Sequence, residues 1–455
     1  MHTNQVYSEL VTVSNGPHKW WHRRWVKIIG ISVIVLIVVA VILALVLNFV
    51  VFIAKESETN TTVISSSSPL TTTISTPPSL STATSLVIPT TTLSKTTTTR
   101  LVTSTTTLPQ TTATTSTQQS EWSITGNMNN ARAYHTASVL PNGKVLVIGG
   151  RHTFMYPAVL NSAELYDPST GIWTTTDNMT KARMHHTASV LLNGKVLVTG
   201  GRDSDSYTAN SNELYDPSTG IWTTTGNMAH ARNGHTASVL SNGKVLVTGG
   251  YGNSGYLNSA ELYDPSTGIW TTTSNMTNTR YWHTASVLLN GRILVTGGYG
   301  NSGYLNSAEL YDPSIGTWTT TGNMTNARYY HTASILPDEK VLVIGGWNAS
   351  IVYNSAELYN PSTGIWTTTS NMTNTRYWHT ASVLLNGKVL VTGGNDYSST
   401  LNSAVLYDPS TGMWTTTGSM TNARQDHTAS VLSNGKVLVT GGHGDTGYLN
   451  SAELY

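Results

Sequence analysis

The last three quarters of the chain consist of one sequence unit that recurs seven times. One copy reads R-x-x-H-T-A-S-V-L-x-N-G-K-V-L-V-T-G-G, then a variable loop, then N-S-A-E-L-Y-D-P-S-T-G-I-W-T-T-T. The double glycines of successive copies are 51, 49, 48, 48, 48 and 48 residues apart. They are Gly149–Gly150, Gly200–Gly201, Gly249–Gly250, Gly297–Gly298, Gly345–Gly346, Gly393–Gly394 and Gly441–Gly442. A repeat of this length indicates an array in which each unit is completed by its neighbours.

Each unit predicts four short β-strands. "HTASVL" and "KVLVTGG" predict the first two strands, joined by a hairpin turn at "NGK". "SAELYD" and "IWTTT" predict the third and fourth strands, joined by a turn at "DPSTG". No stretch of residues 121–455 shows sustained helical periodicity. The repeat therefore predicts an all-β fold, a β-propeller whose small sheets pack face to face around a central channel.

The unit resembles the kelch repeat over the whole of residues 121–455. The double glycine, a later tyrosine and the tryptophan of the fourth strand carry this resemblance. The tyrosines are Tyr166, Tyr215, Tyr263, Tyr311, Tyr359, Tyr407 and Tyr455, and the tryptophans are Trp122, Trp173, Trp222, Trp270, Trp318, Trp366 and Trp414. The resemblance implies a seven-bladed propeller. It also implies a ligand site like that of peptide-binding members, across the face that carries the loop before the first strand and the loop after the double glycine.

The two ends of the repeat region complement each other. It opens on "EWSIT" at 121–125, a fourth strand without the first three, and closes on "SAELY" at 451–455, a third strand without a fourth. We expect residues 121–126 to pair with the last blade, 424–455, and to close the ring. Such closure removes free sheet edges that favour aggregation.

The first 120 residues predict an anchor and a stalk. Residues 28–54 form an uncharged run of 27 residues, longer than the about 20 needed to span a bilayer and longer than the apolar region of a cleaved signal peptide. Lys19, Arg23, Arg24 and Lys27 precede the run, which predicts a cytoplasmic tail at 1–27 and an extracellular or lumenal propeller, with the plasma membrane as the expected location. Residues 59–120 contain 37 Ser or Thr and no acid. The segment 55–120 therefore predicts a disordered stalk, either O-glycosylated or an unmodified linker.

Composition excludes several classes of function. The chain has no cysteine, which removes disulfides, thiolate nucleophiles and Cys-ligated zinc. Residues 121–455 carry 17 Lys and Arg against 20 Asp and Glu. This slight excess of acidic residues does not favour nucleic-acid binding, which needs a basic surface. We expect no cofactor and no metal.

The repeated polar residues predict a structural role. One histidine per unit follows an arginine by three residues: His135, His186, His235, His283, His331, His379 and His427. Seven equivalent positions around a ring cannot converge on one metal ion, so we expect these histidines to bond the backbone of their strand or of the neighbouring blade. The arginines need buried partners, and third-strand acids are the candidates: Glu164, Glu213, Glu261, Glu309, Glu357 and Glu453. The sixth unit has Val405 at this position, which leaves that pairing open.

The positions that differ between units are the candidate ligand-binding residues. One set stands between the Arg and the His, and the other follows the double glycine. The candidates are Tyr134, His185, Tyr251, Tyr281, Trp282, Tyr299, Tyr329, Tyr330, Trp347, Tyr377, Trp378, Gln425 and Asp426. We expect exposed aromatic side chains on units three to six, suited to an extracellular protein or a glycan. The alternative is that these aromatics only fill the rim of the channel.

The sequence gives little support to the hypothesis that the chain is an enzyme. "GYGNSG" and "GHGDTG" match a dinucleotide-binding pattern, but a strand and a turn follow them where that site needs a helix. Kelch propellers that are copper radical oxidases use a tyrosine crosslinked to a cysteine, and this chain has no cysteine. An extracellular enzyme with an unrecognised site is the alternative to a binding protein.

Six N-x-S/T sequons predict N-glycosylation if the propeller lies outside the cell. They are Asn60, Asn178, Asn275, Asn323, Asn348 and Asn371. Four of them read "NMT" in the loop that joins consecutive units, so simple repetition of the unit is the alternative origin.

Overall fold

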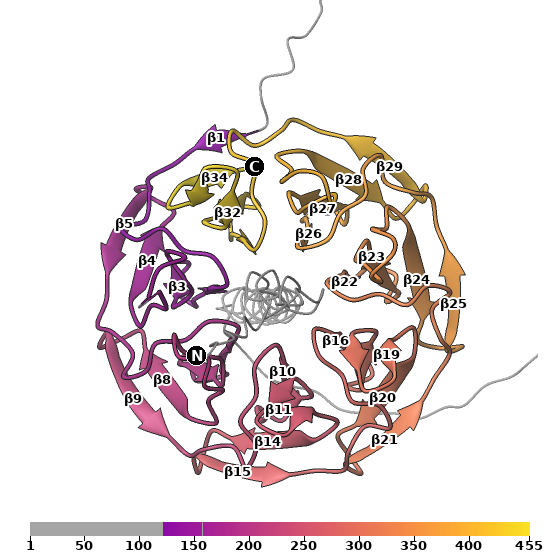
Figure 1. Ribbon diagram of the computed structural model, residues 1–455, viewed down its shortest axis with the longest axis horizontal. Helices are drawn as coiled ribbons and strands as arrows, with labels where there is room; N and C mark the ends of the chain where they lie inside the picture. The colour runs from indigo at the N-terminus through magenta and orange to yellow at the C-terminus, as the bar shows by residue number, and fades with distance from the viewer. Residues whose placement is uncertain (1–121, 157) are drawn as a thin grey trace, which may run out of the picture. The chain divides into compact units, whose positions relative to one another are not determined.

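The computed structural model describes residues 122–156 and 158–455. This part of the chain is all-β, and it folds into seven four-stranded sheets arranged in sequence order around a common centre (Figure 1). Within the described residues no helix has the length and hydrophobicity that crossing a membrane requires. The predicted tail, membrane span and stalk at 1–27, 28–54 and 55–120 lie outside the described residues.

Every blade has the same four-stranded antiparallel order. The first, innermost strands are β2 (Thr136–Val139), β6 (Thr187–Val190), β10 (Thr236–Val239), β16 (Thr284–Val287), β22 (Thr332–Ile335), β26 (Thr380–Val383) and β30 (Thr428–Val431). The second strands are β3 (Val145–Ile148), β7 (Val196–Thr199), β11 (Val245–Thr248), β17 (Ile293–Thr296), β23 (Val341–Ile344), β27 (Val389–Thr392) and β31 (Val437–Thr440).

The third and fourth strands lie toward the outside of the ring (Figure 1). The third strands are β4 (Ala163–Asp167), β8 (Asn212–Asp216), β14 (Ala260–Asp264), β20 (Ala308–Asp312), β24 (Ala356–Asn360), β28 (Ala404–Asp408) and β34 (Ala452–Leu454). The fourth strands are β5 (Ile172–Thr175), β9 (Ile221–Thr225), β15 (Ile269–Thr272), β21 (Thr317–Thr320), β25 (Ile365–Thr368), β29 (Met413–Thr416) and, in blade seven, β1 (Ser123–Ile124).

Three blades add a short hairpin after the double glycine. These hairpins are β12 (Tyr251–Gly252) with β13 (Gly255–Tyr256), β18 (Tyr299–Gly300) with β19 (Gly303–Tyr304), and β32 (His443–Gly444) with β33 (Gly447–Tyr448). They belong to blades three, four and seven.

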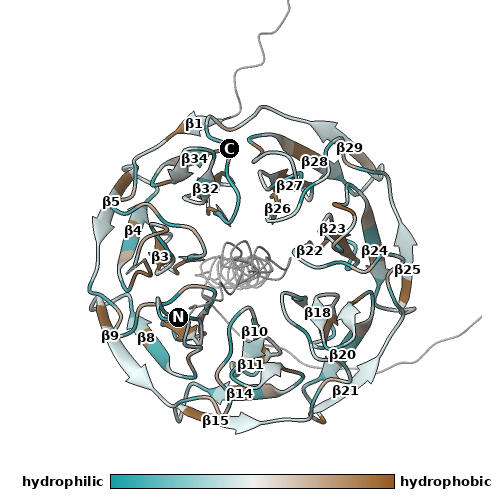
Figure 2. Cartoon of the chain, viewed as in Figure 1, coloured by the Kyte–Doolittle hydropathy of each residue, from teal (hydrophilic) through white to brown (hydrophobic). Residues whose placement is uncertain are grey.

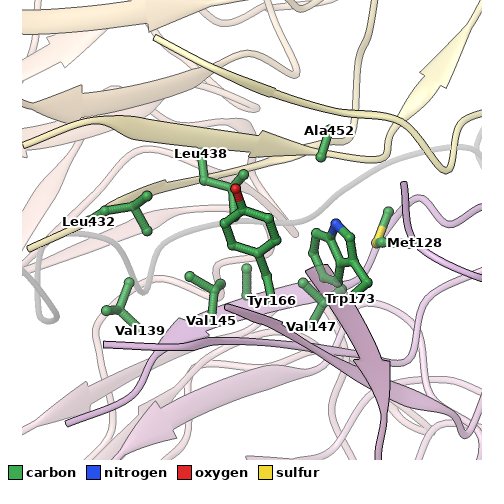
Figure 3. Packing of buried hydrophobic residues seen from close by; sticks show 10 residues of the cluster. Met128, Val139, Val145, Val147, Tyr166, Trp173, Leu432, Leu438 and Ala452 are labelled. Atoms are coloured by element: carbon green, nitrogen blue, oxygen red, sulfur yellow. The ribbon is translucent and has the colours of Figure 1, made fainter. Parts of the chain in front are cut away.

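The core lies between the blades. Every residue of β3 is buried, because its sheet has a neighbour on both faces, and its strand is therefore apolar without alternation. Figure 3 shows one such interface, in which Tyr166 of blade one lies beside Leu438 of blade seven, and Trp173 and Leu432 belong to the same cluster. Apolar segments occur in every blade around the ring (Figure 2).

The N-terminal strand completes the last blade. β1 pairs antiparallel with β34, with Ser123 opposite Leu454 and Ile124 opposite Glu453. The indole N–H of Trp122 donates to the carbonyl of Gly418 at 2.7 Å. The pairing expected between residues 121–126 and the last blade is thus present, and it joins the two ends of the propeller.

Candidate binding face

Two loops of each blade meet on one face of the propeller. The residue after the conserved Arg pairs with the residue after the double glycine, as in blade four, where Tyr281 N–H donates to Tyr299 O at 2.8 Å and Tyr299 N–H to Tyr281 O at 2.9 Å. The same bridge joins Ala133 to Arg151, Met184 to Arg202, Asn233 to Tyr251, Tyr329 to Trp347, Tyr377 to Asn395 and Gln425 to His443. The two variable sets singled out in the sequence are therefore neighbours in every blade.

The double glycine makes this close approach possible. A Cβ on Gly298 would lie 2.8 Å from the carbonyl oxygen of Tyr281 and 2.9 Å from the Cβ of His283. Gly298 also has a φ of +93°, a conformation that L side chains rarely adopt. A side chain here would push the two loops apart, so glycine at this position sets the shape of the face.

The second residue between the Arg and the His has a left-handed backbone in every blade. The seven residues are Tyr134, His185, Gly234, Trp282, Tyr330, Trp378 and Asp426, with φ from 54° to 61°. Amides of successive blades connect them, since His185 N–H donates to Tyr134 O at 3.3 Å and Trp282 N–H to Gly234 O at 3.0 Å. Because all seven blades share this conformation, it belongs to the architecture of the ring.

Most aromatic residues between the Arg and the His are buried, so the expectation that they are exposed is wrong. Tyr281, Tyr329 and Tyr377 are 8, 1 and 8% exposed. The hairpin or loop of the preceding blade covers each of them: Tyr281 lies 5.8 Å from Tyr251, and Tyr377 lies 6.0 Å from Trp347, between ring centroids. These side chains support the face from below, and their removal would leave cavities.

The aromatic side chains that reach the surface follow the double glycines and line the hairpins. We define the aromatic arc as Tyr251, Tyr256, Tyr299, Tyr304 and Trp347, on blades three to five. Tyr251 is 41% exposed and the other four are half-buried. Each ring contacts the next one along the arc. The ring centroids of Tyr256 and Tyr299 are 5.3 Å apart, and those of Tyr299 and Tyr304 are 4.8 Å apart. Desolvation by burial, with repulsion from neighbouring tyrosines, raises the pKa of Tyr256 and of Tyr304 to about 12, so both hydroxyls are neutral at physiological pH.

The remaining candidates are also inside the structure. Tyr134, His185, Gln425 and Asp426 are buried, as are Trp282 and Tyr330, while Trp378 is half-buried. The rings of Trp282 and Tyr330 are 4.5 Å apart, so they pack on each other across neighbouring blades. The alternative that aromatics between the Arg and the His fill the channel rim fits these positions better than a direct role in binding.

Several exposed apolar residues near the face escaped the sequence analysis. They lie in the loops between the second and third strands, where the blades differ in length and composition: Phe154, Met155, Tyr156, Tyr207, Ile351 and Tyr397. The repeat identifies residues that occupy equivalent positions in several blades, and these loop residues have no equivalent in the other blades. Departure from the repeat was the available signal.

The repeated histidines join adjacent blades, which confirms their predicted structural role, but their Nε2 atoms contact threonine hydroxyls of the neighbouring blade where backbone partners were expected. His235 Nε2 lies 3.0 Å from Thr187 Oγ1 and 3.1 Å from Thr199 Oγ1, both in the preceding blade. Desolvation by burial, followed by repulsion from Arg183 and His185, lowers the pKa of His186 to about 3, and burial and Arg328 do the same for His331. All seven histidines have lowered pKa values. Within the described residues, no three His, Cys, Asp or Glu side chains are grouped to hold a metal ion.

The predicted arginine and glutamate pairs are present in six blades. Arg280 Nη2 lies 2.8 Å from Glu309 Oε1, with both side chains fully buried. The other pairs are Arg132–Glu164, Arg183–Glu213, Arg232–Glu261, Arg328–Glu357 and Arg424–Glu453, at 2.6 to 3.0 Å. We interpret these pairs as structural, because both side chains of each pair are buried.

Comparison with known proteins agrees with the repeat. Residues 185–375 match the family model described as the KLHDC2/KLHL20/DRC7 Kelch-repeats domain, and residues 132–180 and 379–421 match the Kelch motif. An F-box/kelch-repeat protein of Arabidopsis thaliana is 38% identical over 85 residues, which is 19% of this chain and 22% of that protein. This match therefore spans only about a fifth of that relative.

Among solved structures, the chain is similar to a fungal alcohol oxidase of the AA5 family, solved in complex with copper. The TM-score is 0.61 with 21% sequence identity, over 74% of this chain and 76% of the oxidase. At this level of identity the likeness shows a shared fold.

Proposed function

The chain belongs to the kelch-repeat β-propeller family, and from this premise we propose that it is a binding scaffold that recognises an extracellular protein through the aromatic arc, with a glycan as the alternative ligand. Kelch propellers commonly bind proteins. The observation that carries the proposal is the continuous surface strip from Tyr251 to Trp347, on the face where the variable loops of the blades meet.

The chemistry of the arc suits recognition. Tyrosine and tryptophan supply large contact areas with few rotatable bonds, and they are enriched among residues that dominate binding energy. The buried layer formed by Tyr281, Tyr329 and Tyr377 holds the surface rings in place, so little ordering is needed on binding. Neutral tyrosine hydroxyls can both donate and accept hydrogen bonds, and the same rings can stack on sugars.

The proposal places the propeller outside the cell, displayed on the stalk at 55–120 and anchored by 28–54. The length of the apolar run and the basic residues before it support this arrangement. The exposed sequons at Asn178, Asn275, Asn323 and Asn371 are compatible with it. Protease added to intact cells that express the full chain tests the orientation, since an extracellular propeller is released and a cytoplasmic one is protected.

The arc is tested by replacing Tyr251, Tyr299 and Trp347 with Ala in the full chain. Binding is measured against an extracellular protein library and a glycan array. The matched control replaces Leu192, Leu289 and Leu385, three exposed residues of the hairpins at the opposite ends of the strands. We expect loss of binding in the arc variant alone, with melting temperatures close to the parent. Equal binding by the arc variant and the parent contradicts the proposal.

An oxidase is the second candidate, because the fold is shared with the AA5 alcohol oxidase. The residues do not fit that chemistry: the family cofactor needs a cysteine, and the chain has none. Copper binding and hydrogen peroxide formation by the purified full chain test this alternative. Stoichiometric copper with alcohol-dependent peroxide would favour the enzyme over the binding scaffold.

A further inference from the structure

Blade six differs from the other six blades at one buried position of its third strand. The other blades pair the repeated arginine with a third-strand glutamate, whereas the third strand of blade six has Val405 at the position of that glutamate. Arg376 and Val405 are 0% and 1% exposed. Among the described residues no carboxylate lies within ion-pair distance of Arg376, so its charge is buried without a partner of opposite sign. Desolvation by burial lowers its pKa to about 10.

In the six regular blades the glutamate also accepts two backbone amides. Glu309 Oε2 accepts from Thr277 N at 2.7 Å, and Oε1 accepts from Asn278 N at 3.2 Å, beside its contact with Arg280. The carboxylate therefore fills a pocket with one guanidinium and two amide donors. Blade six has the same turn at Thr373 and Asn374, and neither amide has a hydrogen-bond acceptor among the described residues.

The guanidinium of Arg376 keeps the position that the arginine has in the other blades, although blade six has no glutamate carboxylate. Arg376 Nη1 donates to Gly393 O at 2.9 Å and to Ser403 O at 3.2 Å, and Nη2 donates to Ser403 Oγ at 3.2 Å. In blade four the equivalent distances are 3.0, 2.9 and 2.9 Å.

The backbone of the turn is also held as in blade four. Met372 N–H donates at 2.9 Å and Arg376 N–H at 3.1 Å to the preceding blade, against 2.9 and 3.0 Å for Met276 and Arg280. The turn at Thr373 and Asn374 therefore has not shifted toward Val405 to fill the space of the longer glutamate side chain.

Valine cannot replace the carboxylate. Val405 holds the register of the strand, opposite Val391 and Thr416, but its side chain ends one carbon beyond Cβ and carries no acceptor. The atoms that a glutamate would add beyond Cγ are one carbon and two oxygens, which is the heavy-atom composition of formate. The guanidinium of Arg376 is buried without a carboxylate to balance its charge, which is energetically unfavourable, and the amides of Thr373 (an exposed residue) and Asn374 (a half-buried residue) have no acceptor among the described residues.

The nearest acid does not fill this place. Asp396 lies on the loop after the double glycine, and its Oδ1 accepts the amides of Ser398 and Ser399 at 2.9 and 2.8 Å. It attracts Arg376 only at longer range.

We propose that blade six holds a small carboxylate anion of formate size between the guanidinium of Arg376 and the amides of Thr373 and Asn374. The anion takes the place that a glutamate side chain has in the other six blades. Its binding makes the stability of this blade depend on a soluble ligand, and it is independent of the function proposed for the aromatic arc.

The test compares the melting temperature of the full chain, followed by tryptophan fluorescence, in formate and in gluconate, a carboxylate too large for the pocket, at constant ionic strength. We expect formate to raise the melting temperature by about 2 °C at saturating concentrations, because a ligand that binds only the native state stabilises it. Val405→Glu should melt higher than the parent without formate and show no response to it. Val405→Gln, which fills the pocket with a neutral amide, should also lose the response.

A gain-of-site variant completes the test. Glu309→Val reproduces the blade-six arrangement in blade four and should add a second, formate-dependent rise in melting temperature. The proposal is overturned if formate acts equally on the parent and on Val405→Glu. It is also overturned if gluconate stabilises the parent as much as formate does, or if neither carboxylate has an effect, which would mean that water occupies the pocket.

Discussion

The Nε2 atom of His235 lies 3.0 Å from the Oγ1 atom of Thr187, across the boundary between blades two and three. The equivalent contact occurs at every boundary, including the one between His135 and Thr428 that joins blade one to blade seven. The repeated histidine is thus a connector between neighbouring sheets, and a propeller closed by seven such connectors has no unpaired boundary among its described blades.

The connectors predict loss of stability in acid. Desolvation by burial, the largest cause, and repulsion from the preceding arginine lower the pKa of each histidine in the folded state, to about 3 for His186 and His331, against about 6.5 in the unfolded chain. The native state therefore binds fewer protons than the unfolded state between these values. Stability is fully present above pH 6.5 and falls as the pH is lowered toward 3, by about 1.4 kcal/mol per pH unit for each histidine. Urea unfolding from pH 8 to pH 5 measures this slope, and a flat profile would contradict it.

The ring closure predicts a cost for removing residues 121–126. Trp122 is buried against Tyr455 with ring centroids 5.1 Å apart, and its strand covers the edge of β34. Loss of a buried tryptophan costs about 3–5 kcal/mol, so the melting temperature should fall by about 10 °C. A deletion of the same length at 111–116 is the control and should leave it unchanged. Equal melting temperatures for the two deletions would refute closure as a source of stability.

Two glycines of blade four, Gly298 of the double glycine and Gly303 of the following hairpin, predict different losses of stability when replaced by alanine. Gly298 and Gly303 share a φ of +93°, but a Cβ would collide with Tyr281 O at Gly298 and meet nothing within 4 Å at Gly303. Gly303→Ala should cost about 1 kcal/mol through backbone strain alone, while Gly298→Ala should cost clearly more because the loops must separate. Chemical denaturation of both variants measures the difference. Similar values would show that the close approach contributes little.

The sequons predict selective glycosylation when the full chain is made in its own cells. Asn178, Asn275, Asn323 and Asn371 are exposed, whereas Asn348 is half-buried and donates from Nδ2 to Tyr353 OH at 2.5 Å. Glycopeptide mass spectrometry should find sugars at the four exposed sites and little at Asn348. Glycosidase treatment without any shift in mobility would argue against an extracellular propeller.

The sequence predicted the fold well because the fold is periodic. Each blade repeats the same strand and turn signals, and the conserved Arg, His and Trp could be assigned to packing from their recurrence alone. The blade count followed from the same pattern, as did the completion of the last blade, in which β1 (Ser123–Ile124) pairs with β34 (Ala452–Leu454).

The candidate site was predicted less well because recurrence does not report exposure. Tyr281 and Tyr299 are both tyrosines at variable positions, and they are bonded to each other through their backbones. Only the tertiary structure shows that the hairpin of blade three covers Tyr281, while Tyr299 reaches the surface. Residues such as Phe154 and Tyr207 were missed for the opposite reason, since they lie where the blades stop resembling one another.

The claim that the loop face is the recognition surface is tested most directly by site-specific crosslinking on intact cells. A photoreactive phenylalanine replaces Tyr251 on the loop face, or Ile269 on the opposite side of the same blade, and both positions are exposed. Irradiation should yield discrete adducts with an extracellular partner from position 251 and none from position 269. Adducts from position 269 alone, or equal adducts from both positions, would contradict a binding site on the aromatic arc.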